Sequence, residues 1–283
     1  MTDHGRQSVW RDTGGASAAQ ARDLADRLEL RAKGEDEVEA RTAYLGLLGV
    51  SAGERVLDVG CGSGAVTREI ARRVGAGGRA VGLDASPELL TVARELAQEA
   101  GLGGHVEFRE GSALDLPFPD GAFDAVLAVT VLSHVPGGEG AIPEMARVVR
   151  PGGRVGVFDF DADMTAFTHP DRPLTRRIVA AASDALAVDG WLVRRLPLLL
   201  ARAGLEDVHV RGFFPIETDP HSFYGTLAER SADAALKAGA VTEGERRAWL
   251  DALETERAAG PVLAGRLHLF VWGRKPERRG PRP

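Results

Sequence analysis

Short apolar runs alternate with longer amphipathic stretches along most of the chain. The runs are almost uninterruptedly apolar and are bounded by Gly, Pro or Asp, a pattern typical of parallel strands buried on both faces. The expected strands, in chain order, are residues 56–59, 80–83, 106–109, 123–129, 154–160, 208–216 and 267–272.

Apolar residues at helical spacing fill the stretches between these runs. Ser86 before Pro87 indicates a helix start, and Gly75 and Gly204 each follow a helical stretch. Helices are expected from residue 17 onward and over residues 36–48, 67–74, 87–100, 139–149, 173–187, 195–203, 221–238 and 242–259. The alternation predicts an α/β fold with a doubly wound, mostly parallel seven-stranded sheet.

Two parts of the chain depart from the regular alternation. Residues 1–50 are expected to form an N-terminal helical cap, and residues 51–274 the main domain. Helical insertions are expected at about 161–190 and 219–265, after the fifth and sixth strands, and residues 275–283 have the composition of a disordered tail.

Composition narrows the class of protein. The chain has 283 residues, of which 44 % are hydrophobic, so it can bury a sizeable core. Its net charge of −6 disfavours a nucleic-acid partner, because phosphate binding normally needs a basic face. A single cysteine, Cys61, excludes an intramolecular disulfide and a cysteine-built zinc site. The sequence shows neither a signal-like N-terminal segment nor a run of about 20 apolar residues, so we expect a cytoplasmic protein without a membrane partner, of undetermined oligomeric state.

The first strand ends in a turn with three alternating glycines, Gly60, Gly62 and Gly64. Glycine lets the backbone turn sharply and approach a ligand, and the following helix N-terminus offers free N–H groups. Gly60, Gly62 and Ala65 fit the G-x-G-x-x-[G/A] fingerprint of NAD and FAD sites. Asp84 ends the second strand at the distance that ribose recognition requires, but it suits more than one nucleotide cofactor.

Asp58 favours a different cofactor, because dinucleotide folds usually carry an apolar residue at this position. The sequence Leu-Asp-Val-Gly-Cys-Gly-Ser-Gly over residues 57–64 resembles the first motif of class I S-adenosylmethionine-dependent methyltransferases. Further stretches resemble that family in the same order, and they are residues 82–86, 111–120, 123–126 and 144–153. The resemblance covers roughly residues 52–159 and is strongest to the branch of ubiquinone/menaquinone-biosynthesis and other small-molecule methyltransferases.

The resemblance implies a Rossmann-like methyltransferase fold that binds S-adenosylmethionine and releases S-adenosylhomocysteine. Asp58 would face the cationic methionine end, and Asp84 would accept both ribose hydroxyls. Ser112 stands where the family often has Asp, which predicts a weaker adenine contact. The cofactor-binding residues that the resemblance implies are Asp58, Gly60, Cys61, Gly62, Gly64, Asp84, Ala85, Ser112, Ala113, Val129 and His134.

Methyl transfer needs mainly an aligned acceptor, and a base only where the acceptor must lose a proton. His134, after the fourth strand, is the candidate base or acceptor-orienting group, and packing against the cofactor is the competing interpretation. Asp159 and Asp161 point to the same side of the fifth strand, so either is a candidate acceptor contact. The side chains of Asp159, Asp161, His134 and His169 are of types that bind metal ions. Their spacing matches no metal-binding motif, so no metal is expected.

We therefore expect a methyltransferase that acts on oxygen, nitrogen or carbon of a small metabolite in biosynthesis or specialised metabolism. An NAD- or FAD-dependent oxidoreductase and a cofactor-binding protein without methyl transfer are the alternatives. The acceptor pocket should be roofed by the non-repeating parts, which are Trp10 and the N-terminal helices, the helix from Pro173, and residues 221–224. Arg194 and Arg195 are either contacts for an anionic acceptor or a solvated pair.

Overall fold

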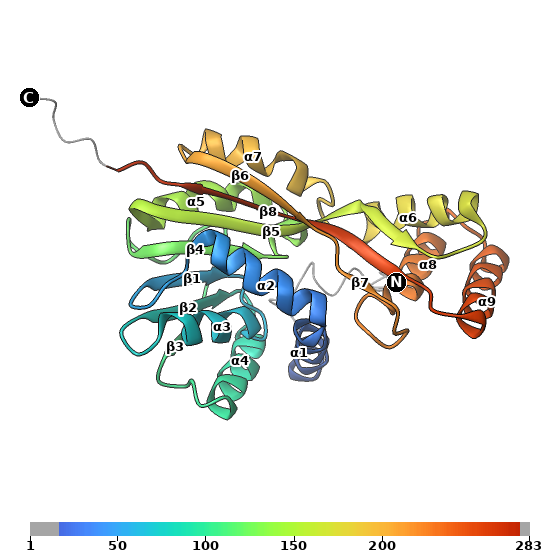
Figure 1. Ribbon diagram of the computed structural model, residues 1–283, viewed down its shortest axis with the longest axis horizontal. Helices are drawn as coiled ribbons and strands as arrows, with labels where there is room; N and C mark the ends of the chain where they lie inside the picture. The colour runs from blue at the N-terminus through green and yellow to red at the C-terminus, as the bar shows by residue number, and fades with distance from the viewer. Residues whose placement is uncertain (1–16, 278–283) are drawn as a thin grey trace, which may run out of the picture.

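The computed structural model describes residues 17–277. They form one sheet in the order β3-β2-β1-β4-β5-β8-β6, with β7 paired to β8 (Figure 1). The strands are β1 (Arg55–Val59), β2 (Arg79–Asp84), β3 (Val106–Glu110), β4 (Phe123–Val129), β5 (Val149–Phe167), β6 (Glu206–Phe213), β7 (Ile216–Glu217) and β8 (Ala264–Arg274).

The order of the first five strands gives the sheet its binding edge. β1 lies in the middle, β2 and β3 follow on one side, and β4 and β5 follow on the other, all parallel. The chain direction across the sheet thus reverses between β1 and β4. At such a switch point the loops after the two strands diverge and leave a crevice beyond the carboxyl ends. The doubly wound α/β fold expected from the sequence is confirmed.

Helices cover both faces of the sheet and extend one end of it. They are α1 (Ala18–Lys33), α2 (Glu35–Leu48), α3 (Ala65–Val74), α4 (Pro87–Glu99), α5 (Ala141–Val148), α6 (Arg172–Leu186), α7 (Leu192–Arg202), α8 (Leu227–Lys237) and α9 (Glu243–Ala259), with short 3₁₀ turns at Leu132–His134 and Gly138–Gly140. The core on one face joins α2 and α3 to the sheet, and the core on the other joins α5 and α7. The apolar stripe of α1 packs on α4.

β5 and β8 run past the rest of the sheet as a two-stranded arm that ends at α6, α8 and α9, which we call the helical lobe (right in Figure 1). Trp249 is fully buried at the centre of the lobe core. Within the arm, residues 161–164 of β5 form a bulge between the paired positions Phe160–His268 and Thr165–Arg266. The lobe is therefore attached to the sheet by β5–β8 pairing on both sides of this bulge.

Several element boundaries differ from the sequence-based expectation, and each difference has a local cause. The expected strand 208–216 breaks into β6 and β7 at Pro215, which lacks a backbone N–H. The expected helix 221–238 begins only at Leu227, after a run of turns in which Gly225 approaches the Asp219 carbonyl so closely that a Cβ would lie 2.1 Å from it.

At the C-terminus only residues 275–277 of the expected tail are described, and Lys275 is anchored there. Its Nζ donates to the carbonyls of Ala146 and Val149 at 2.7 and 2.8 Å. Trp10 lies outside the described residues. No helix between residues 17 and 277 is long and apolar enough to cross a lipid bilayer.

Phe270 gives a test of the core between the sheet and α2. Its fully buried ring packs at 5.6 Å from the Tyr44 ring and at 5.1 Å from the Trp272 ring. Phe270→Ala should therefore lower the free energy of unfolding by about 3–5 kcal/mol. Urea unfolding of the wild type and the variant measures this loss, provided that both proteins have the same m value. Val210→Ala, at an exposed position on β6, should cost less than about 1 kcal/mol, and equal losses would contradict this core assignment.

Candidate functional site

The turn after β1 adopts backbone conformations that require glycine. Gly60, Gly62 and Gly64 all have positive φ, at 71°, 53° and 76°. A Cβ on Gly60 would lie 2.4 Å from Val131, and one on Gly62 would lie 2.7 Å from Leu28. Val131 and Leu28 thus pack directly on the turn, and at Gly60 and Gly62 the backbone itself lines the crevice.

Asp84 at the end of β2 holds this turn in place. One carboxylate oxygen accepts from the Gly62 N–H at 2.8 Å, and the other accepts from the Ser86 N–H at 3.0 Å. The Asp84 side chain is nearly buried, and burial raises the pKa of its carboxyl. Each oxygen retains capacity for a second donor, so a ligand with hydroxyl groups can bind here.

Asp58 lies within β1, two residues before the first glycine of the turn. Its carboxylate accepts from the Thr67 hydroxyl at 2.6 Å, and only 1 % of the residue is exposed. Burial raises the pKa of this carboxyl, the Thr67 hydrogen bond opposes the shift and the Asp84 charge adds to it, and the resulting pKa is about 7. A cationic ligand group beside Asp58 would favour the ionised carboxylate.

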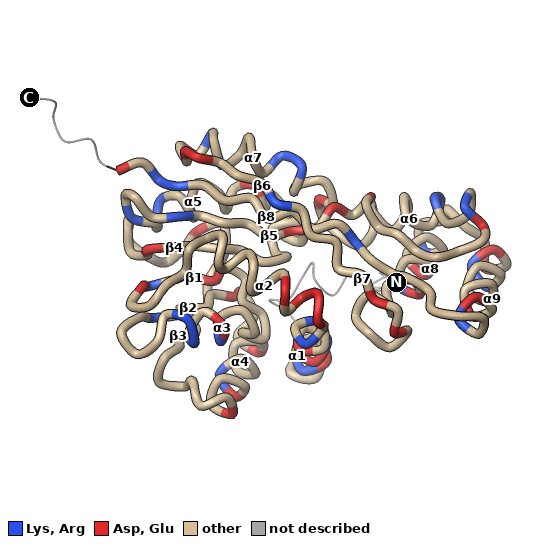
Figure 2. The backbone as a smooth tube through the Cα atoms, viewed as in Figure 1, with Lys and Arg blue, Asp and Glu red and all other residues tan. Residues whose placement is uncertain are grey.

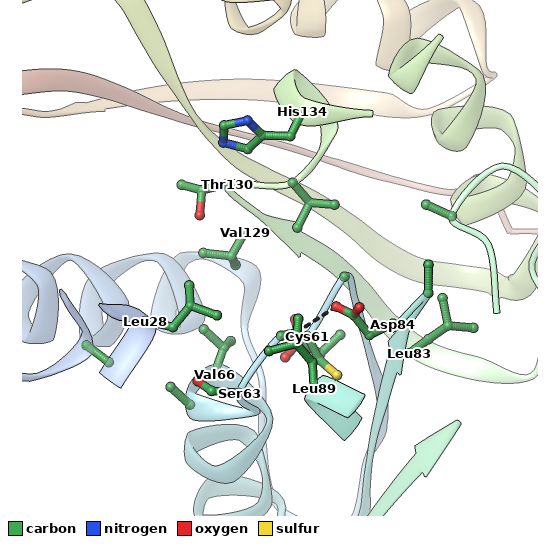
Figure 3. A pocket seen from close by; sticks show the side chains of 18 of the residues that line it. Leu28, Cys61, Ser63, Val66, Leu83, Asp84, Leu89, Val129, Thr130 and His134 are labelled. Atoms are coloured by element: carbon green, nitrogen blue, oxygen red, sulfur yellow. Dashed lines mark hydrogen bonds between the residues drawn. The ribbon is translucent and has the colours of Figure 1, made fainter. Parts of the chain in front are cut away.

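These residues surround a cavity of about 220 Å³, which we call the first cavity. Figure 3 shows Asp84 and Cys61 at one end of it and Thr130 and His134 at the other. The structure brings together the cofactor residues predicted from the sequence, and those that line the first cavity are Asp58, Gly60, Cys61, Gly62, Asp84, Ala85, Ser112, Ala113, Val129 and His134.

Gly64 is the exception among the predicted residues. It caps α3 and faces inward, where an added Cβ would lie 2.8 Å from the Phe108 ring. Its glycine is required for the turn and for packing and does not line the first cavity. The Ser112 hydroxyl accepts from the Leu114 N–H at 3.1 Å, so part of its hydrogen-bonding capacity is used by its own loop.

The segment after β4 forms the far end of the first cavity. Thr130 has a φ of 53°, a strained value for a β-branched residue. Its N–H donates to the Phe158 carbonyl, and its hydroxyl accepts from Arg31 of α1, both at 2.6 Å. His134 follows on a 3₁₀ turn, with its ring 5.4 Å from the Phe160 ring. Strain of this kind at a cavity wall is typical of functional sites.

A second cavity of about 560 Å³ adjoins the first. Both cavities are lined by Leu28, Arg31, Thr130 and His134, which therefore mark the junction between them. The remaining wall of the second cavity comes from Phe160 of β5, from Arg266 and His268 of β8, from Arg27 of α1, and from α6, α8 and residues 223–224. Of the segments expected to roof an acceptor pocket, the helix from Pro173 and residues 223–224 line this second cavity.

A buried polar network at the junction was not predicted from the sequence. Arg31 donates to Glu37 at 2.9 Å, Glu37 accepts from the Tyr224 hydroxyl at 2.6 Å, and that hydroxyl lies 3.4 Å from His268 Nε2. Burial alone would raise the pKa of Glu37, but the Arg31 charge holds it below its ordinary value. Burial, together with the Arg31 charge, lowers the pKa of His268 to about 3, so this ring is neutral.

Asp159 and Asp161 lie outside both cavities. The two side chains continue the face of β5 that packs on α7, because Phe158 and Phe160 occupy the cavity face. Asp159 accepts from the Ser133 N–H and hydroxyl at 3.1 and 2.8 Å, and Asp161 pairs with Arg194 at 2.6 Å. Their carboxylates support the 3₁₀ turn and the bulge, and this placement does not favour the acceptor contact expected from the sequence.

The other candidate residues from the sequence make contacts outside both cavities. Arg195 pairs with Asp189 and with Glu139, and neither it nor Arg194 lines either cavity. His169 stacks on Trp249 at 4.7 Å in the lobe. Among residues 17–277 no three His, Cys, Asp or Glu side chains converge in an arrangement suited to a metal ion.

Comparison with known proteins adds to this geometry. Residues 57–157 match the family model described as "Methyltransferase domain". Sterol 24-C-methyltransferase of Eremothecium gossypii is 30 % identical over 264 residues, which cover 81 % of this chain and 68 % of that protein. Demethylmenaquinone methyltransferase of Tropheryma whipplei is 40 % identical over 147 residues, which cover 52 % of this chain and 56 % of that protein.

Solved structures share the fold. Phosphoethanolamine N-methyltransferase 2 of Haemonchus contortus, solved with S-adenosyl-L-methionine, has a TM-score of 0.60 and 15 % identity over 97 % of this chain and 61 % of that chain. The chain spans about half to two thirds of the length of the curated relatives it matches.

The raised pKa of Asp58 predicts a pH-dependent stability. Between about pH 4 and pH 7 the folded protein holds a proton on Asp58 that the unfolded chain has lost. The resulting stabilisation is complete below that range and disappears as the pH rises through 7. From about pH 4 to about pH 8 the unfolding free energy of the wild type should fall, relative to Asp58→Asn, by on the order of 4 kcal/mol.

Urea unfolding of the ligand-free proteins at a series of pH values measures this difference. Asp251→Asn, at an exposed position on α9, should follow the wild type throughout. A difference between wild type and Asp58→Asn that does not change with pH would contradict the raised pKa.

Proposed function

The chain belongs to the S-adenosylmethionine-dependent methyltransferases, and from that premise we propose that it transfers the methyl group of S-adenosylmethionine to a small-molecule acceptor. The family match includes Asp58, the glycine turn and Asp84, so the resemblance drawn from the motifs is confirmed. An NAD- or FAD-dependent oxidoreductase is not supported, because the same turn belongs to a methyltransferase domain.

The first cavity fits the cofactor by its chemistry. The buried carboxylate of Asp58 suits the cationic methionine end, and the backbone of the glycine turn leaves room for it. Asp84 would accept from the ribose hydroxyls with the oxygen capacity that remains. Ala85, Ser112 and Ala113 would surround the adenine. When bound there, S-adenosylmethionine supplies an electrophilic methyl group on its sulfonium.

The observation that supports the proposal most strongly is the junction of the two cavities. Thr130 and His134 line both, so a cofactor in the first cavity and an acceptor in the second can meet beside them. The protein's part in the transfer would be to hold the acceptor in line and exclude water, for which α1 and the helical lobe provide the cover. A second cavity of about 560 Å³ is in the size range of small-molecule sites.

His134 is the proposed acceptor contact at the junction. An imidazole there can orient an acceptor hydroxyl or amine by a hydrogen bond, or take its proton where the reaction requires one. The names of the relatives include C-methyltransferases of sterols and of quinone biosynthesis, which supports a small biosynthetic metabolite as acceptor here.

Asp84→Ala tests the cofactor assignment. The substitution removes two charge-assisted hydrogen bonds to ribose and loosens the Gly62 turn. Affinity for S-adenosylhomocysteine should fall by at least about 100-fold in calorimetry. Asp251→Ala, at an exposed acid on α9, should bind as the wild type does. An unchanged dissociation constant in Asp84→Ala would exclude the ribose role.

His134→Ala tests the junction. Turnover should fall by about 10²- to 10⁴-fold if His134 moves a proton, whereas the affinity for S-adenosylhomocysteine should change by less than about fivefold. S-adenosylhomocysteine formation with a panel of small phenols, amines and carbon acids gives the turnover. His105→Ala, at an exposed loop position, is the matched control. Losses of equal size in turnover and affinity would instead assign His134 to cofactor packing.

A further inference from the structure

The second cavity is lined by more cationic than anionic side chains. Its cations are Arg27, Arg31, Arg230, Lys237 and Arg266, and its acids are Asp184 and Asp233. Both acids are exposed, and Asp233 is engaged by Arg246 at 2.6 Å. The acids therefore do not neutralise the interior of the cavity.

Two of these arginines have no acidic partner among the described residues; Arg266 is buried, and Arg230 is partly exposed. Arg266 is only 9 % exposed, and its Nε donates to the Thr165 hydroxyl at 2.9 Å while its guanidinium lies over the Phe160 ring at 4.8 Å. Arg230 donates to the Phe223 carbonyl at 3.1 Å and lies over the Phe223 ring at 4.8 Å. Neither forms an ion pair with any residue between 17 and 277.

The burial of Arg266 without an ion pair is unusual and costly. Arginine is almost never buried in proteins unless it is paired, because its charge loses water without compensation. Burial lowers the pKa of both guanidinium groups, neighbouring cations add to the shift, and the resulting pKa of each is about 10. Arg31 differs, because Glu37 neutralises it at 2.9 Å. The contacts that hold Arg230 and Arg266 are neutral, so they orient the guanidinium groups and leave the positive charge available.

From this arrangement, and resting on the proposed function of the same site, we infer that the methyl acceptor carries an oxyanion, a carboxylate or a phosphate, that Arg230 and Arg266 bind. A guanidinium offers a planar fork of donors that matches either group. Phe160 and Phe223 give the same cavity two apolar ring faces for the body of the molecule.

The position of Arg266 relates this anion site to the junction. Its guanidinium contacts the Phe160 ring, and that ring lies 5.4 Å from the His134 ring. An acceptor anchored by its anion at Arg266 would thus extend along Phe160 towards Thr130 and His134, where the methyl group is transferred. The anionic group would be a specificity element and not the methylated atom.

The test compares anions with neutral molecules of the same shape. Benzoate, phenyl phosphate, benzamide and phenol are titrated at constant ionic strength into the full chain, both free and saturated with S-adenosylhomocysteine, with thermal shift and calorimetry as readouts. At least one anion should bind more tightly than its neutral counterpart by at least about tenfold. Which of the two anions binds better distinguishes a carboxylate from a phosphate acceptor.

Variants assign the effect to the two arginines. Arg230→Gln and Arg266→Gln should each weaken anion binding by at least about tenfold and leave the binding of neutral molecules unchanged. Arg211→Gln, on the exposed edge strand β6, should bind anions as the wild type does. Arg266→Lys, which retains the charge, should bind more tightly than Arg266→Gln, and binding of S-adenosylhomocysteine shows that each variant is folded.

The outcomes separate the two proposals. Equal binding of anions and neutral analogues by the wild type, or undiminished anion binding in both glutamine variants, would overturn the inference even where S-adenosylhomocysteine binds. Failure of the wild type to bind S-adenosylhomocysteine would instead overturn the proposed function, and the titrations of the free protein would still decide whether the arginines form an anion site.

Discussion

The ion pair of Arg31 and Glu37 connects the parts of this molecule that form the site. Arg31 lies on α1 and Glu37 on α2, and their side chains are almost fully buried. Arg31 also donates to Thr130 after β4, and Glu37 accepts from Tyr224 next to the helical lobe. Removal of one partner from a buried ion pair typically destabilises a protein strongly, because the other charge is left uncompensated. The position of α1 over both cavities therefore depends on this pair.

The sequence predicts the sheet and the cofactor turn well because their physical causes are local. Buried parallel strands need continuous apolar residues, and the turn needs glycine at positive φ, so both leave a recognisable pattern. Arg31 and Glu37 leave none, since charged residues on an amphipathic helix are indistinguishable from a solvated face until the partners are placed. For Asp159 and Asp161 the period of two predicts a shared side, but only the packing of α7 shows that this side faces away from the cavities.

The two cavities differ in the sign of their buried charge. Figure 2 shows acidic and basic residues interspersed on α1 and α9, without separation along these helices. Of the described residues around the cavities, two acids without an ion-pair partner, Asp58 and Asp84, line the first, and two arginines without one, Arg230 and Arg266, line the second. Under the proposed function, these charges would favour a cationic ligand group in the first cavity and an anionic one in the second.

The bulge in β5 has a consequence for changes in chain length. Between the pairs Phe160–His268 and Thr165–Arg266, β5 contains three more residues than β8. An odd excess reverses the alternation of faces, so Thr165 shares the cavity side with Phe160 and can hold Arg266. Insertion or deletion of a single residue in this arm would turn Thr165 to the opposite side. A change in the length of this arm would therefore separate Arg266 from the hydroxyl that orients it, even if no residue of the cavity wall were substituted.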